Sequence, residues 1–135
     1  MIDLIVLYRA LNLFSHHAHN MVKGDEFFQD HTFFAEVYDL ADKFYDDTIE
    51  REIGTKSDKI SLIAIMHESS KLLMPLSNNY YQETLKLIEK AMKEIDSLTK
   101  NGKLSIGTQN MIAGQADELE KLVFKINRRV LDEMV

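Results

Sequence analysis

Four side chains in this sequence could bind a metal ion through nitrogen and oxygen atoms: His19, His31, Asp46 and Glu50. The chain contains no cysteine, which excludes disulfides, thiolate metal sites and cysteine nucleophiles. Asp46 and Glu50 are four residues apart, and this spacing places both carboxylates on one face of a helix. Carboxylate and imidazole ligands together suit redox metals such as iron or manganese. The first prediction is therefore a metal site with nitrogen and oxygen ligands.

The two histidines lie symmetrically about residue 25, directly beside Gly24. A tight antiparallel helical hairpin turning at this glycine brings the two imidazoles level with each other on adjacent helices. His31 and Asp46 are fifteen residues apart, however, which is about 22 Å along one continuous helix. The histidine pair and the carboxylate pair therefore cannot hold one metal ion within a single chain.

A second copy of the helix that carries His31 removes this separation. If two copies pack antiparallel across a twofold axis near residue 39, His31 of one chain lies opposite Asp46 and Glu50 of the other, and the symmetry creates two such sites. Each site has two nitrogen and two oxygen ligands and leaves positions open for water, dioxygen or peroxide. A di-iron site inside one bundle would use Glu-x-x-His motifs, which this sequence lacks. The sequence thus predicts sites shared between subunits.

Apolar residues recur at helical spacing in four long segments, each of which predicts a helix. The predicted helices cover residues 2–21, 25–53, 78–100 and 105–133, and a short helix over 58–68 lies in the connection between the second and the third. Asp25 is expected to cap the second helix and Gly54 to end it, while Pro75 and Ser77 mark the start of the third. This order predicts an all-α, ferritin-like four-helix bundle with an extra helix in the crossover connection.

The length and charge of the chain narrow its class and its partners. A chain of 135 residues, of which 45% are hydrophobic, predicts one globular domain over residues 1–135. The net charge of -6 repels nucleic acid phosphates, so DNA is a disfavoured partner. Lys125, Arg128 and Arg129 form the one basic cluster, which is interpreted as a solvated helix end.

The N-terminal apolar run does not predict a membrane segment. It extends from Ile2 to Leu7, contains Asp3 and is far too short to cross a bilayer. It also has no basic residues before it, as a secretory signal peptide would. A cytoplasmic protein without a membrane partner is therefore expected.

The segment AHNMVKGDEFFQDH, together with the later Asp46 and Glu50, resembles the motif of Dps-type mini-ferritins. The spacing H-x11-H-x14-D-x3-E matches this motif in full, and LSIGTQNMIAGQADELEKLVF resembles the start of the family's last helix. The resemblance extends from about residue 10 to about residue 130. It implies His19, His31, Asp46 and Glu50 as the ligands of a ferroxidase site, with Glu50 binding the tighter iron.

The same resemblance implies a function and an assembly. The protein would oxidise Fe(II), preferentially with hydrogen peroxide, and store ferric mineral in a hollow shell of twelve subunits, which protects against oxidative damage. Iron would be the bound metal. The shell would be a homo-oligomer built from twofold dimers.

The chain departs from the family pattern at several positions. Ala35 stands where the family often has an acidic residue, so the second iron position is expected to be weak. Asn20 replaces a tryptophan, and Tyr38 or Tyr45 could take its place in intercepting radicals, although both are interpreted as packing residues. Many members bind DNA through a lysine-rich N-terminal extension, and such binding is not expected here, because the sequence begins directly with the first predicted helix. Two alternatives to the iron-oxidising function stay open. The chain could form a structural ferritin-like oligomer with weak or no ferroxidase activity, or it could be a DNA-protecting nucleoid protein.

A few further residues are secondary candidates. His16 is three residues before His19 and so has the spacing to face the same metal, but it is assigned to solvent or an interface. Asp39 lies near the proposed twofold axis, where it could form an auxiliary metal contact or a salt bridge. Asp117 and Glu118 could line a pore that draws in cations, although an exposed charged face is the simpler interpretation.

Overall fold

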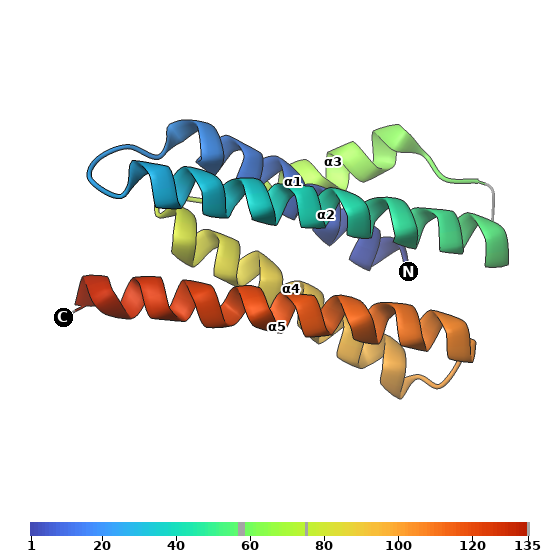
Figure 1. Cartoon of the computed structure of the whole chain (residues 1–135). Coiled ribbons are helices and arrows are strands. Elements are labelled where there is room, and N and C mark those ends of the chain that lie inside the picture. Colours follow the sequence, from blue (N-terminus) through green and yellow to red (C-terminus); the bar gives the residue numbers. More distant parts are fainter. Residues whose placement is uncertain (57–58, 75, 135) are drawn as a thin grey trace.

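The computed structural model describes residues 1–56, 59–74 and 76–134, and these residues form five α-helices without a strand (Figure 1). The helices are α1 (Ile2–Met21), α2 (Phe27–Thr55), α3 (Leu62–Leu73), α4 (Tyr80–Lys100) and α5 (Ile106–Met134). Helices α1 and α2 form one antiparallel hairpin, α4 and α5 form another, and the crossover that contains α3 joins them (Figure 1). The predicted four-helix bundle with an extra crossover helix is confirmed.

Helix α1 lies at the centre of the packing, because it contacts α2, α3 and α4. Its apolar residues therefore extend around most of its circumference rather than along one stripe. Burying each aliphatic side chain stabilises the fold by about 1.5–3 kcal/mol. The buried apolar residues of α1 are Leu4, Ile5, Val6, Leu7, Tyr8, Ala10, Leu11, Phe14 and Ala18.

None of the described helices is both long and apolar enough to cross a membrane.

The turn between α1 and α2 depends on a glycine. Gly24 has a φ of 100°, a conformation in which a side chain would be strained. Its carbonyl oxygen accepts a hydrogen bond from the Phe27 N–H at 3.1 Å, which closes the turn just before α2 begins. The predicted reversal at Gly24 is confirmed, and it sets the relative register of α1 and α2.

Several predicted helix ends were wrong. The N-cap of α2 is Glu26 rather than Asp25 and makes no side-chain capping bond, and α2 continues through Gly54 to Thr55. Glycine weakens a helix without forbidding it, and the rest of this long helix outweighs that cost of about 1 kcal/mol. The crossover helix was predicted over 58–68 but is Leu62–Leu73, because the hydroxyl of Ser61 accepts the Ala64 N–H and caps it there.

The start of α4 also differs from the prediction. This helix begins at Tyr80, two residues later than predicted, with Asn79 as its N-cap. The Ser77 hydroxyl accepts the Asn79 N–H at 3.1 Å, so it shapes the approach to the helix instead of capping it. Of the residues named in the predictions for this crossover, 58 and Pro75 lie outside the described residues.

A chain of neutral hydrogen bonds crosses the interior of the bundle. The Tyr8 hydroxyl donates to Gln115 Oε1 at 2.6 Å, and Gln115 Nε2 donates to Thr48 Oγ1 at 3.0 Å. All three residues are buried, and burial raises the pKa of the Tyr8 phenol far above its usual value. Tyr8 therefore stays neutral, and this chain of hydrogen bonds ties α1, α5 and α2 together without a charge.

Candidate metal site

His19 and His31 meet across the α1–α2 hairpin. Their rings are stacked with centroids 3.5 Å apart and an angle of 19° between the ring planes. His19 Nδ1 bonds to the backbone oxygen of His31 at 2.6 Å, and His31 Nδ1 bonds to the backbone oxygen of His19 at 2.7 Å. The predicted convergence of the two imidazoles is confirmed.

These reciprocal bonds decide which nitrogen of each ring can bind a metal. A carbonyl oxygen only accepts hydrogen bonds, so each Nδ1 must carry the proton and donate it. In the neutral form of each ring, the other nitrogen, Nε2, then holds the lone pair that a metal needs. Metal-binding histidines in proteins are usually oriented in this way, by a hydrogen bond from the second ring nitrogen. The pair is therefore pre-arranged as two nitrogen ligands.

Aromatic side chains surround the histidine pair. The Phe27 ring stacks on His31 at a centroid distance of 4.9 Å, and the Tyr38 ring meets His19 edge-on at 5.3 Å. His16 is exposed and stacks on Tyr38 at 4.2 Å, while its ring lies 6.0 Å from that of His19. The structure thus pairs His16 with Tyr38, in agreement with a solvent-side role.

The two carboxylates lie on the same helix as His31 but far from it. Helix α2 is continuous over Phe27–Thr55, so the fifteen residues between His31 and Asp46 correspond to about 22 Å. Asp46 and Glu50 are both exposed. Among the described residues, no three or more histidine, aspartate or glutamate side chains are grouped to hold a metal ion. The structure brings the two histidines together and leaves both carboxylates free to meet another molecule.

The acidic candidates on α5 have partners within their own helix. Lys121 Nζ lies 3.7 Å from Asp117 Oδ2 and 3.0 Å from Glu118 Oε1. Exposed pairs of this kind are worth little to stability, but they partly neutralise the acidic surface. They fit an exposed charged face, the simpler of the two interpretations.

The comparison with known proteins is informative for the fold alone. No family model matches the chain, and no curated protein matches it. A solved structure described as a DPS protein from Vibrio cholerae O1, "a member of a broad superfamily of ferritin-like diiron-carboxylate proteins", matches with a TM-score of 0.64. The alignment covers 96% of this chain and 85% of that one at 18% identity. The chain has a ferritin-like fold.

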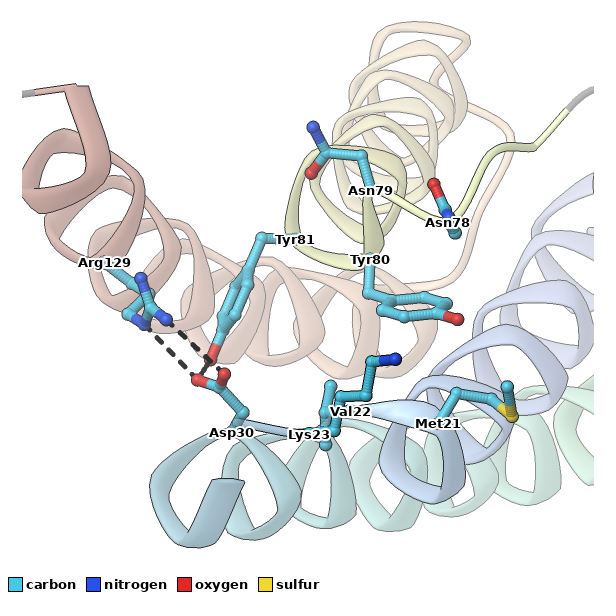
Figure 2. Close-up of a pocket in the computed structure, with 9 residues that line it drawn as sticks. All are labelled: Met21, Val22, Lys23, Asp30, Asn78, Asn79, Tyr80, Tyr81 and Arg129. Atoms are coloured by element: carbon cyan, nitrogen blue, oxygen red, sulfur yellow. Dashed lines mark hydrogen bonds and ion pairs between the residues drawn. The ribbon is translucent and has the colours of Figure 1, made fainter. Parts of the chain in front are cut away.

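One end of this ferritin-like bundle holds a polar cluster that the sequence analysis missed (Figure 2). Asp30 is buried, accepts the Tyr81 hydroxyl on Oδ1 at 2.5 Å, and contacts Arg129 through both carboxylate oxygens at 3.3 and 3.4 Å. The three side chains line a cavity of about 640 Å³ between the α1–α2 turn, the start of α4 and the end of α5. The prediction that the basic cluster is a solvated helix end was wrong for Arg129.

Lys125, from the same basic cluster, is also engaged. Its Nζ lies 2.7 Å from Glu36 Oε1 and so links α5 to α2 at the surface. The sequence contained one signal for the buried acid: Asp30 precedes Phe34, Val37 and Ala41 on the face of α2 that the structure buries. An aspartate at a core position needs a partner, because an unpaired buried charge is costly.

Proposed function

We propose that this chain is the subunit of a mini-ferritin that binds and oxidises Fe(II), with hydrogen peroxide or dioxygen as the oxidant, and stores the ferric product. Each site would take His19 and His31 from one chain and Asp46 and Glu50 from its partner. Iron is the substrate and the stored cargo, and the proposed assembly is a dodecamer built from twofold dimers. The reciprocal pairing of the two imidazoles is the observation that carries this proposal.

The geometry of α2 supports a site made by two chains. His31 and the carboxylate pair stand on either side of residue 39, so an antiparallel copy of α2 would align each with the other. Exposed apolar side chains on α3 support a subunit contact as well, because patches of this kind usually mark protein interfaces. They are Leu62, Ile63 and Met66.

The donor set suits iron oxidation. Two neutral imidazoles and two carboxylates leave coordination positions for water and for the oxidant. The negative charge of the carboxylates stabilises Fe(III) more than Fe(II), so the bound ion gives up an electron more readily. The chain's own contribution is to hold the ligands: the backbone oxygens of His19 and His31 fix both rings before the metal arrives.

The test is Fe(II) loading without oxygen, followed by peroxide and measurement of ferric absorbance. Wild type should oxidise iron faster than buffer, whereas His31→Ala and Glu50→Ala should fall towards the buffer rate, since each removes a ligand. The matched controls are His67→Ala and Glu89→Ala, which change exposed residues on α3 and α4 and should oxidise iron like wild type. A wild-type rate equal to that of buffer rules the proposal out.

The proposed assembly gives a second expected result. Twelve chains of 15.6 kDa correspond to about 187 kDa by light scattering. A mass near that of one chain would remove the shared site, because its ligands come from two chains. A large oligomer that does not oxidise iron would instead favour a structural ferritin-like protein, the function that Ala35 keeps open.

A nucleoid function is the third candidate, and the charge opposes it. The net charge of -6 disfavours contact with phosphate backbones. A gel-shift assay at physiological salt tests the nucleoid function, because a DNA-protecting protein must still bind DNA at that salt concentration. The iron-storing and the structural proteins are expected to leave the DNA unshifted.

A further inference from the structure

Phe28 and Ile53 are the large apolar side chains that helix α2 leaves exposed, at 79% and 44%. They lie near the two ends of the helix, about 25 residues or about seven turns apart, so both are on one face. The buried residues of the helix, Val37 and Phe44 among them, fall on a different side. Large side chains of this type are enriched where proteins meet, because contact removes their apolar surface from water.

The positions of these two residues mirror those of the proposed ligands on α2. Phe28 lies three residues before His31, and Ile53 lies three residues after Glu50. Two antiparallel copies of α2 can set His31 level with Glu50 of the partner subunit. The same register then sets Phe28 level with Ile53 of the partner subunit. The proposed ligands and the exposed apolar residues thus point independently to one register.

Phe27 joins the exposed phenylalanine to the histidine pair. The Phe28 ring meets the Phe27 ring at a centroid distance of 5.4 Å and an angle of 70°, and Phe27 stacks on His31 at 4.9 Å. One aromatic ring therefore stands between Phe28 and the nitrogen ligands. An apolar side chain that packs on Phe28 lies at the outer end of the proposed iron site.

The same register leaves room for the second carboxylate. Ala35 lies four residues after His31. Asp46 lies four residues before Glu50. Ala35 is therefore level with Asp46 of the partner subunit, and its methyl group leaves space there for the carboxylate.

The middle of this face is acidic and does not favour association by itself. Asp39 and Asp42 are exposed near the twofold axis, so two copies bring like charges together. Arg9 Nη1 lies 3.6 Å from Asp42 Oδ1 and offsets part of that charge. The attraction between two copies therefore has to come from the ends of the face, where the apolar residues lie.

We propose that Phe28 packs against Ile53 of the partner subunit, which makes one apolar contact at each end of an α2–α2 dimer. The proposal deepens the function proposed above and rests on it, because the shared site supplies the register. The occupant of the face is a second copy of the chain, since a twofold axis matches each end of α2 with the other end. The contact forms without metal.

The test introduces cysteine, which the chain lacks. The double variant Phe28→Cys/Ile53→Cys is oxidised mildly without metal and analysed on a denaturing gel without reductant. Most chains should become covalent dimers, because level positions on two packed helices come within disulfide range. A disulfide within one chain is ruled out, because the two positions are about 37 Å apart along α2.

Two kinds of control accompany the double variant. Each single variant should stay monomeric on the gel, because the antiparallel register keeps each cysteine far from its own copy. Phe28→Cys/Asp46→Cys tests the register, since Asp46 is exposed on the same face but about 10 Å nearer the middle of α2. It should give few dimers. Equal linking in the register control, or no linking in Phe28→Cys/Ile53→Cys, overturns the proposed contact.

The metal-free measurement keeps this contact separate from the iron function. If wild type oxidises iron but the double variant gives no covalent dimer, the contact is wrong and the iron function stands. If the double variant links in the expected register but wild type oxidises iron no faster than buffer, the contact stands and the iron function fails.

Discussion

Mixed oligomers of two inactive variants should recover about a quarter of the wild-type rate of Fe(II) oxidation per site. The variants are His31→Ala and Glu50→Ala, co-expressed in equal amounts. A shared site works only when its histidines come from a Glu50→Ala chain and its carboxylates from a His31→Ala chain. Random pairing produces that combination at about one site in four, because each of the two choices has even odds.

This mixing experiment separates a shared site from one within a single chain. If all four ligands of a site came from the same chain, every site in the mixture would lack a ligand, and the rate would stay at that of the separate variants. Oligomers that contain only one variant serve as the control. The same measurement on chains that were assembled separately and mixed afterwards shows whether subunits exchange.

Phe34→Ala should have the largest effect on stability, a loss of about 3–5 kcal/mol in the free energy of unfolding. Phe34 is fully buried and packs against the Tyr81 ring at a centroid distance of 4.8 Å. Removing its ring leaves a cavity where α2 meets α4. Urea unfolding followed by circular dichroism measures the loss, at one protein concentration, because an oligomer's apparent stability depends on it.

Phe124→Ala is the matched control for this substitution. Phe124 loses the same ring but is 66% exposed on α5, so the change should stay within about 0.5 kcal/mol in an isolated chain. A similar loss for both variants would mean that Phe124 is buried by another subunit. A small loss for Phe34→Ala would mean that the core between α2 and α4 is looser than the structure indicates.

The bundle and the histidine pair could be predicted because both follow from local patterns. Helical spacing of apolar residues indicated all four long helices, and the symmetric placement of His19 and His31 about the turn indicated that they would meet. Helix ends were less predictable, since capping depends on which backbone groups the turn leaves free. Ser61 caps α3 because its hydroxyl accepts the Ala64 N–H, whereas Glu26 precedes α2 without a side-chain capping bond.

The polar cluster was missed because its partners are far apart in the sequence. Asp30 and Tyr81 are separated by 51 residues, and Asp30 and Arg129 by 99. Each residue alone reads as a surface charge or a packing ring, and only the arrangement of α2, α4 and α5 brings them together. The proposed pairing of the carboxylates with His31 also depends on long-range structure, because it needs two chains: one chain cannot place Asp46 and Glu50 beside His31.

The short α1–α2 turn has a consequence for biosynthesis. The two hydrogen bonds that orient His19 and His31 span only twelve residues of sequence, so the pair needs little more than one helical hairpin to form. Contacts this local form early in folding. We therefore expect the two proposed nitrogen ligands to be arranged early, by a hairpin that is translated before α4 and α5 and before any partner chain is met.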